Sequence, residues 1–318
     1  MAGPRTLADL DEADLLELIV PLVTAGGPAV LVGPGDDAAV VADPGPTVVT
    51  TDAMVRGRDW RDDWSSAADV GAKVVTQNLA DVAAMGARPT GLVVTLLAAP
   101  QTPLDWVLDF SRGLGEAAAA AGCPVLGGDL SSTPPGQLAV SVTALGSLDG
   151  RRAVLRSGAR PGDVVAVRGT LGRSAAGLLL LEQDRPDIGP ELVAVHRRPV
   201  APLAAGPAAA LAGASAMLDL SDGLLRDGSR IAAASGVCLE LSSTALEPYA
   251  ARLTPAVGPD PAWDCVLGGG EEHSLLACFP AAVTPPKEWA IVGRVVAGGG
   301  VRLDGQPQAP RGWDHFRP

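Results

Sequence analysis

The sequence predicts an α/β protein of two domains, and three observations lead to this prediction. The chain has 318 residues, which is long for one hydrophobic core but ordinary for two domains. Segments rich in β-branched residues alternate with segments of helical periodicity, as they do in mixed α/β folds. A polar stretch rich in glycine and arginine, "DGRRAVLRSGARPGD" at 149–163, interrupts this alternation near the middle of the chain. We therefore expect one domain at 1–148 and a second at 149–318.

The first half of the chain predicts three helices and three strands. Residues 8–24 repeat apolar side chains at helical spacing, with acidic residues on the polar face. The long segment 65–87 opens on a Ser-x-x-Asp pattern, which is typical of a helix N-terminus, and it stops at "GARP". A third helix is expected at 103–121, and strands are expected at 47–55, 90–98 and 137–148.

The second half predicts a further mixed pattern of helices and strands. The strand "DVVAVRG" follows the polar connection, and "AMLDL" at 216–220 is a second strand. Helices are expected near 172–183, near 200–213 and from about 222, with another strand near 237–241. Either Ser221 or Asp222 is placed to cap the helix that begins at about 222.

Composition and charge exclude several classes of function. The net charge is −12, only two residues are lysine, and no run of basic residues occurs, so we expect no nucleic-acid surface. The four cysteines lack CxxC spacing, which argues against a disulfide framework or a zinc site. The uncharged stretch 199–218 is mostly Ala, Gly and Pro, and reads as a buried helix plus strand, not as a membrane helix. The N-terminus lacks the basic start and apolar run of a signal peptide, so we expect a cytoplasmic protein without membrane contact.

Aspartates recur where predicted strands and helices begin or end: Asp36, Asp37, Asp52, Asp129, Asp219 and Asp222. Each of them alone has an ordinary interpretation as a turn or cap residue. Asp81 is different, because it lies inside an otherwise apolar helix where an unpaired charge is costly to bury. It follows Asn78 by three residues, so both side chains should project from one face of the helix.

Taken together, these carboxylates favour a site for a hard cation. Magnesium prefers oxygen ligands and usually shares them with a substrate phosphate. An acidic protein that handles an anionic substrate needs divalent cations between the two. The sequence contains no GxxxxGK[ST], no kinase glycine loop with its paired lysine, and no GxGxxG after a first strand. Phosphoryl transfer can still proceed by positioning and charge neutralisation, without a Cys/His or Ser/His pair.

Seven motifs, in this order and spacing, resemble the thiamine-monophosphate kinase family: "GDDAAV", "TTDAMV", "NLADVAAMGA", "VLGGD", "LRSGARPGD", "LDLSDGL" and "GGGEE". This family belongs to the superfamily that includes aminoimidazole ribonucleotide synthetase and selenophosphate synthetase. The resemblance runs from about residue 8 to the final "GWDHF". It implies an aminoimidazole ribonucleotide synthetase-like fold. The N-terminal domain would bind ATP and magnesium and pair its sheet across a homodimer, and the C-terminal mixed α/β domain would complete the active-site cleft.

The resemblance also implies ATP-dependent transfer of a phosphoryl group to the phosphate of thiamine monophosphate, assisted by several Mg²⁺ ions. The implied metal positions are Asp37, Thr50, Thr51, Asp52, Asp81, Asp129, Asp219 and Asp222. The implied catalytic residues are Asp81, Asp129 and Asp222. The implied nucleotide contacts are Gly128, Asp129, Arg156 and Ser221. The implied substrate contacts are Asp59, Glu271 and Trp313.

Some residues depart from the usual pattern of this family. Asp59 stands where histidine is common, Arg173 stands where aspartate is common, and Glu272 replaces an aspartate. Two alternatives therefore stay open. The first is a sister enzyme of the superfamily that phosphorylates another acceptor, although the N-terminal cysteine expected of a selenophosphate synthetase is missing. The second is a nucleotide-binding homologue that has lost catalysis.

Overall fold

The computed structural model describes residues 5–23, 29–34, 38–42 and 45–312. The chain divides into two compact units: residues 1–82 with 89–149, and residues 83–88 with 150–318. The short segment 83–88 joins the second unit because its backbone bonds there. The Val154 N–H donates to the Met85 carbonyl at 3.1 Å, and the Arg151 side chain donates to the Gly86 carbonyl at 3.4 Å.

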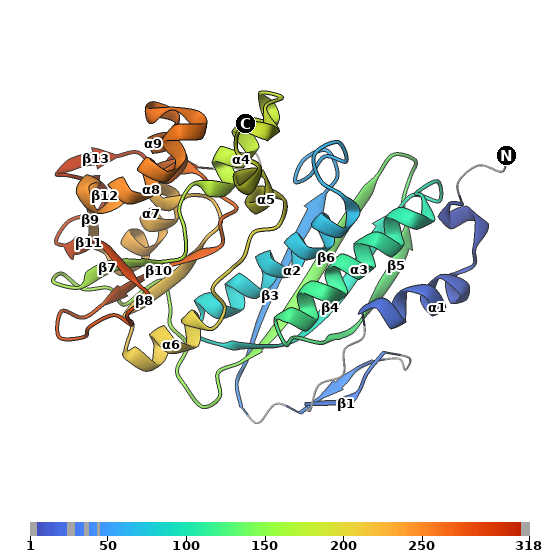
Figure 1. The fold of residues 1–318 in the computed structure, drawn as a ribbon. Coiled ribbons are helices and arrows are strands. Elements are labelled where there is room, and N and C mark those ends of the chain that lie inside the picture. Colours follow the sequence, from blue (N-terminus) through green and yellow to red (C-terminus); the bar gives the residue numbers. More distant parts are fainter. Residues whose placement is uncertain (1–4, 24–28, 35–37, 43–44, 313–318) are drawn as a thin grey trace. The chain divides into compact units, whose positions relative to one another are not determined.

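A four-stranded sheet with the strand order β3-β6-β4-β5 forms the first unit (Figure 1). Its strands are β3 (Thr47–Val55), β4 (Arg88–Ala98), β5 (Val125–Ser132) and β6 (Leu138–Ser147). The helices of this unit are α1 (Glu12–Val23), α2 (Ala67–Ala84) and α3 (Leu104–Ala120), with a 3₁₀ turn, η1, at Leu7–Asp9. A separate ribbon pairs β1 (Val30–Val32) with β2 (Val40–Val41). The strands and helices predicted for the first half are therefore confirmed.

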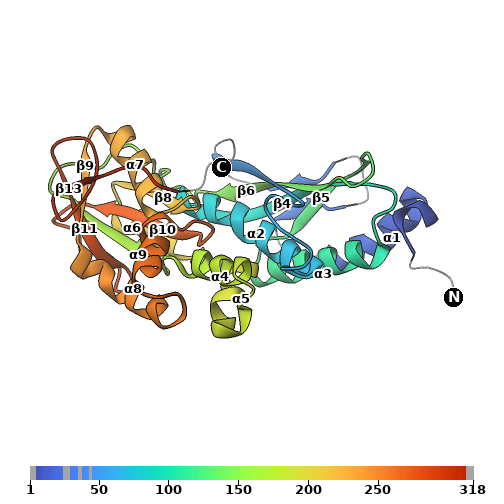
Figure 2. The same ribbon diagram turned by 90° about the horizontal axis from the view of Figure 1, so that it is seen from above.

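Helices α2 and α3 lie across one face of this sheet, and the strands alternate accordingly (Figures 1 and 2). On β3, Thr50 and Asp52 point to the helix-covered face, as does the buried Met54. The opposite face carries exposed apolar side chains. Val49 is 61% exposed and Val55 is 45% exposed. We call this second surface the open face.

Helix α2 begins as the Ser-x-x-Asp pattern predicts. The Asp69 N–H donates to the Ser66 hydroxyl oxygen at 3.2 Å, and the Asp69 carboxylate accepts from the Ser66 N–H at 3.0 Å. These reciprocal bonds form a capping box, which satisfies two backbone donors at the helix start. Because the start is fixed, the positions of Asn78 and Asp81 along α2 are fixed as well.

Glycines allow α2 and α3 to touch at the backbone. A Cβ atom on Gly71 of α2 would lie 2.2 Å from the Phe110 carbonyl oxygen of α3. A Cβ atom on Gly113 of α3 would lie 2.1 Å from the Ala68 carbonyl oxygen of α2. No side chain fits at such distances, so glycine at these two positions sets the separation between the helices.

A seven-stranded sheet with the order β13-β12-β9-β11-β7-β10-β8 forms the second unit. Its strands are β7 (Val164–Arg168), β8 (Ala216–Leu220), β9 (Cys238–Leu241), β10 (Ser274–Phe279), β11 (Ala290–Val296), β12 (Gly300–Leu303) and β13 (Gln306–Gln308). Its helices are α4 (Arg173–Glu182), α5 (Pro190–Arg197), α6 (Ala205–Ala212), α7 (Leu224–Ser235), α8 (Ser243–Val257) and α9 (Pro259–Gly268), with a 3₁₀ turn, η2, at Pro186–Ile188. The sequence analysis did not predict α5, and it gave no bounds for α8 and α9, which follow the strand near 237–241.

Helices cover both faces of this sheet at its β8 and β10 edge. Phe279 of β10 packs in a cluster with Ala209 of α6, whereas Leu276 lies close to Gly228 of α7. Every residue of β8 and β10 is buried as a result. The stretch 199–218 thus contains α6 and most of β8, as predicted. Within the described residues, the helices are all too short or too polar to span a bilayer.

We expect the substitution Gly113→Ala to lower the free energy of unfolding by about 1–3 kcal/mol, because the added methyl group meets the Ala68 carbonyl. This loss should appear although alanine is the better helix former. Urea unfolding monitored by circular dichroism measures it. The matched control is Gly228→Ala on α7, where a Cβ would lie an ordinary 3.5 Å from its neighbours. The control should be neutral or stabilising, and equal losses in the two variants would contradict the close helix contact.

Candidate functional site

Oxygen atoms from β3 and α2 come together on the helix-covered face of the first unit. The Thr50 hydroxyl donates to the Asp81 carboxylate at 2.8 Å, and the Asp52 N–H donates to the Asn78 side-chain oxygen at 3.0 Å. Asn78 is fully buried, and its amide nitrogen donates to the Val74 carbonyl at 2.8 Å. The expectation that Asn78 and Asp81 project from one face of their helix is therefore confirmed. Thr50, Asp52 and Asp81 form what we call the β3–α2 cluster.

Thr51 and Asp129 lie outside this cluster. The Thr51 hydroxyl donates to the Val142 carbonyl at 3.0 Å, and its side chain points to the open face. Asp129 on β5 is exposed, and its carboxylate accepts from the Ser131 hydroxyl at 2.8 Å. Since β3 and β5 are the two edges of the sheet, three strand spacings, about 14 Å, separate Asp52 from Asp129. Two such carboxylates cannot ligate one ion together.

Two further predicted residues have a structural role in the first unit. The Asp59 carboxylate accepts from the Val55 N–H at 2.7 Å and so closes the turn after β3. A Cβ atom on Gly128 would lie 1.9 Å from the Val94 carbonyl oxygen, so β5 needs glycine there to approach β4. The predicted metal ligand Asp37, its neighbour Asp36 and the predicted substrate contact Trp313 lie outside the described residues.

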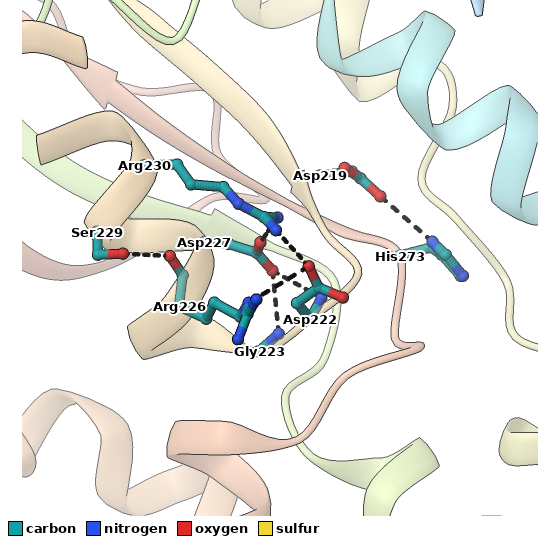
Figure 3. A network of polar contacts seen from close by, with 8 residues as sticks. All are labelled: Asp219, Asp222, Gly223, Arg226, Asp227, Ser229, Arg230 and His273. Carbon is teal, nitrogen blue, oxygen red and sulfur yellow. Dashed lines mark hydrogen bonds and ion pairs between the residues drawn. The ribbon is translucent and has the colours of Figure 1, made fainter. Parts of the chain in front are cut away.

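Asp219 is buried near the C-terminal end of strand β8 and contacts a histidine. Its carboxylate lies 3.3 Å from His273 Nδ1, and both side chains are almost completely buried (Figure 3). The His273 N–H donates to the Leu220 carbonyl at 3.0 Å, which continues the pairing of β8 with β10. The imidazole thus gives a buried carboxylate the polar partner that it requires.

Asp222 follows β8 and is held by two arginines of α7. Its Oδ2 atom accepts from Arg230 Nη2 and lies 3.8 Å from Arg226 Nε (Figure 3). Residues 222, 226 and 230 recur at four-residue intervals, so successive turns of the helix bring the two guanidinium groups to the same carboxylate.

Asp227 is a central residue of this site that the sequence analysis missed. Its side chain is fully buried, and its Oδ2 atom accepts from the N–H groups of Asp222 at 2.9 Å and Gly223 at 3.0 Å. Its Oδ1 atom accepts from Arg230. Asp227 therefore caps α7, and the prediction that Ser221 or Asp222 does so is wrong. The N-cap position is Gly223, one residue later, and it leaves the Asp222 side chain to the arginines. Burial raises the pKa of Asp227 to about 7.

The segment "GGGEEH" brings two glutamates to neighbouring elements of the second unit. The buried Glu272 carboxylate accepts from the Ser174 N–H at 2.9 Å and from the Thr170 hydroxyl, so it caps the start of α4. Burial raises the pKa of Glu272, and the Ser174 N–H opposes that rise. Glu271 lies 3.4 Å from His196 Nδ1, and its N–H donates to the Ser221 carbonyl at 2.8 Å.

His196 and the left-handed backbone at Glu271 add to this picture. His196, on α5, is buried and lies 3.2 Å from the Ser174 hydroxyl as well as close to Glu271. Glu271 has φ = 57° and His273 has φ = 52°, in the left-handed region that residues other than glycine rarely adopt. Strained backbone of this kind gathers at functional sites. The two glutamates thus lie on a backbone segment whose shape is set by α4, α5 and the turn after β8.

Arg156 and Ser221 lie near opposite ends of α7. Ser221 immediately precedes the turn that Asp227 caps, whereas the Arg156 carbonyl accepts from the Ser235 hydroxyl at 3.0 Å at the last residue of the helix. Twelve helical residues span about 18 Å, so the two residues face different parts of any ligand that touches both.

Among the described residues, no group of three or more His, Cys, Asp or Glu side chains is arranged to hold a metal ion. The β3–α2 cluster nevertheless has donors of the type that Mg²⁺ prefers, because all of them are oxygen atoms. Magnesium needs only one or two protein carboxylates when phosphate and water supply the other ligands. The chemistry of this donor set therefore fits a magnesium ion that is bound together with a nucleotide.

Comparison with known proteins shows which family the chain resembles in sequence and in fold. Residues 35–148 match the family model described as AIR synthase related protein, N-terminal domain. A thiamine-monophosphate kinase of Mycobacterium tuberculosis is 48% identical over 293 residues, which cover 90% of this chain and 86% of that protein. The crystal structure of a thiamine-monophosphate kinase from Stenotrophomonas maltophilia covers 94% of this chain and 98% of its own, with a TM-score of 0.82 and 31% identity. The structure of AaThiL complexed with AMPPCP and TMP covers 99% of this chain and 100% of its own, with a TM-score of 0.78 and 30% identity.

The fold is that of the AIR synthase-related proteins, a class whose N-terminal domain the first unit matches. Within this class, the chain belongs to the thiamine-monophosphate kinase family. The family resemblance read from the seven motifs and the predicted α/β fold class are both confirmed.

We expect the stability of the protein to depend on pH through Asp227. A pKa raised from 3.8 to about 7 means that the folded state binds this proton more tightly than the unfolded state does. The contribution of Asp227 to the free energy of unfolding therefore falls as pH rises from about 4 to about 7, by at most about 4 kcal/mol. Asp227→Asn removes this titration and keeps an oxygen that accepts the two backbone bonds. Urea unfolding between pH 4 and pH 8 should show a flatter profile for the variant.

The control for this measurement is Asp304→Asn. Asp304 is exposed, and a hydrogen bond from Ser243 lowers its pKa below 3.8, so its contribution changes only at more acidic pH. This variant should keep the wild-type slope between pH 4 and pH 7. Parallel profiles for the wild type and Asp227→Asn would show that Asp227 does not titrate in this window.

Proposed function

We propose that this protein phosphorylates thiamine monophosphate with ATP, which gives thiamine diphosphate and ADP. The observation that carries the proposal is the 48% identity with a thiamine-monophosphate kinase over most of both chains. The likeness to AaThiL, whose structure contains AMPPCP and TMP, supports the same donor and acceptor. ATP is thus the phosphoryl donor and thiamine monophosphate the acceptor.

The chemistry of the acceptor suits the residues that the chain offers. The attacking atom is a phosphate oxygen, which is already ionised near neutral pH, so no strong general base is required. Catalysis then depends on aligning two anionic substrates and on neutralising their charge. The carboxylates of the site would repel both substrates unless cations lie between them.

We propose that magnesium is held in the first unit by Asp52 and Asp81, with Thr50 beside them. When bound, it supplies charge neutralisation for the nucleotide phosphates. The Thr50 hydroxyl orients the Asp81 carboxylate, and Asn78 fixes the backbone of Asp52. The remaining proposed metal positions are Asp37, Thr51, Asp129, Asp219 and Asp222. The proposed catalytic residues among the metal positions are Asp81, Asp129 and Asp222.

We propose separate contacts for the nucleotide and the acceptor. The nucleotide contacts are Gly128, Asp129, Arg156 and Ser221. Arg156 is exposed, and a guanidinium group can bind a phosphate through two parallel hydrogen bonds. The acceptor contacts are Asp59, Glu271 and Trp313. Glu271 can accept a hydrogen bond from an aminopyrimidine, and an indole face suits a cationic thiazolium.

We propose a cytoplasmic homodimer that pairs through the first unit. The open face of its sheet supports this assembly, since Val49 and Val55 of β3 and Val93 of β4 are 61%, 45% and 38% exposed. A monomer would leave this apolar surface in water. In this proposal residues 1–148 bind ATP and magnesium and form the dimer, and residues 149–318 supply the remaining positions of the site.

The function is tested by ADP release from the purified chain. We expect release that requires Mg²⁺ and thiamine monophosphate together, and thiamine diphosphate should accumulate in equal amount. No stimulation by thiamine monophosphate, with folded protein and magnesium present, would overturn the proposal. Turnover with another phosphorylated acceptor would identify a sister enzyme. Tight AMPPCP binding without turnover on any acceptor would identify a homologue that has lost catalysis.

The magnesium proposal is tested by Asp81→Asn. The amide oxygen can still accept from Thr50, so the fold should survive, but the variant lacks a charged ligand. We expect turnover to fall by orders of magnitude, and Mn²⁺ binding in the presence of AMPPCP, followed by electron paramagnetic resonance, to weaken. Asp109→Asn is the control, because Asp109 is exposed on α3 and pairs with Arg112. Turnover and Mn²⁺ binding near wild-type levels in Asp81→Asn would exclude a metal role for Asp81.

A further inference from the structure

The loop that carries Arg156 is exposed, yet its backbone is fixed at several points. Residues 155–158 are all exposed. The Leu155 carbonyl accepts from the Met217 N–H of β8 at 3.0 Å. Further along, the Arg160 N–H donates to the Asp163 carboxylate at 3.0 Å. An exposed loop buries little apolar surface, so this order is not explained by the packing of its side chains.

The hydroxyl group of Ser235, the last residue of α7, makes three hydrogen bonds to this loop. It accepts from the N–H groups of Gly158 at 3.1 Å and Ala159 at 3.2 Å, and it donates to the Arg156 carbonyl at 3.0 Å. One donor and two acceptor sites are all that a hydroxyl group has, so the loop uses its whole capacity.

Gly158, at the centre of this contact, packs against the backbone of Ser215 in the same chain. Its φ of 134° lies outside the range of ordinary side chains, and a Cβ there would lie 2.3 Å from the Ser215 carbonyl oxygen. The loop is therefore held on two sides, by the Ser235 hydroxyl and by the backbone of Ser215, the residue before β8. The backbone of Arg156 is held between the end of α7 and the start of β8.

Arg156 itself is exposed on this fixed backbone. Among the residues that the structure describes, none accepts a hydrogen bond or forms an ion pair with its guanidinium. A long arginine side chain has several rotatable bonds, so its position depends on where its backbone is held. Arg226 and Arg230 differ in this respect, since both guanidinium groups are engaged by carboxylates of the second unit.

We propose that Ser235 is a positioning residue for the nucleotide, because it fixes the Arg156 loop and so holds the Arg156 guanidinium where it meets a phosphate. This inference rests on the proposed function, in which Arg156 contacts ATP. Helix α7 then has two tasks. At its first turn Asp227 fixes the segment with Ser221 and Asp222, and at its last residue Ser235 fixes Arg156.

The test compares Ser235→Ala with the wild type in steady-state kinetics. We expect KM for ATP to rise by about tenfold, the equivalent of one well-placed charged contact, with kcat and KM for thiamine monophosphate within about twofold. The dissociation constant of AMPPCP, measured by calorimetry, should rise by the same factor. Ser235→Thr keeps the hydroxyl and should restore both values.

The matched control is Ser229→Ala on the same helix. The Ser229 hydroxyl donates at 2.6 Å to the Arg226 carbonyl within α7, so this variant loses only a hydrogen bond inside the helix. Its kinetics should equal those of the wild type. If Ser229→Ala and Ser235→Ala change KM for ATP alike, the effect belongs to the helix and the positioning role is wrong.

A double-mutant cycle separates positioning from a merely structural role. If Ser235 acts through Arg156, adding Ser235→Ala to Arg156→Ala should leave the affinity for AMPPCP almost unchanged. Fully additive losses, or equal rises in KM for both substrates, would overturn the inference. Failure of the wild type to turn over thiamine monophosphate would instead reject the proposed function. The calorimetric cycle with AMPPCP would then still decide the role of Ser235.

Discussion

The part of the candidate site that lies in the second unit depends on the hydrogen bonds that the buried Asp227 carboxylate accepts. One side chain accepts the N–H groups of Asp222 and Gly223 and also binds Arg230, which in turn binds the Asp222 carboxylate (Figure 3). The backbone and the side chain of Asp222 are thus fixed from the same point. A buried charge is costly, and the raised pKa of Asp227 expresses that cost. An apolar residue in its place would leave the N–H groups of Asp222 and Gly223 and the Arg230 guanidinium without this acceptor, so the carboxylate gives the turn between β8 and α7 one defined conformation.

The two units hold their carboxylates in different ways. In the first unit, two neutral side chains contact the aspartates: Thr50 donates to the Asp81 carboxylate, and Asn78 accepts from the Asp52 N–H. In the second unit, basic side chains accompany them, since Asp219 has His273, and Asp222 has two arginines. The metal position proposed at Asp222 lies beside two guanidinium groups, so a metal ion bound there has to overcome their repulsion.

Local patterns explain what the sequence could predict, and contacts between distant elements explain what it could not. The capping box at Ser66 and the shared face of Asn78 and Asp81 follow from helical spacing alone. Side chains alternate between the two faces of a strand, so the sequence is enough to put Thr50 and Thr51 on opposite faces of the sheet. The role of Asp227 was not, because it depends on where α7 starts and on complete burial. The contact of His196 with Glu271 joins α5 to the segment before β10, and no spacing rule connects those elements.

The attachment of α7 at both ends limits how its sequence can change in length. Arg230 and Ser235 act from one rigid helix, one toward Asp222 and the other toward the Arg156 loop. An inserted or deleted residue between them would turn one relative to the other by about 100° and shift it by about 1.5 Å. No adjustment within the helix restores both contacts. We therefore expect insertions and deletions among relatives of this chain to fall in the loops around α7 and to leave the register of the helix untouched.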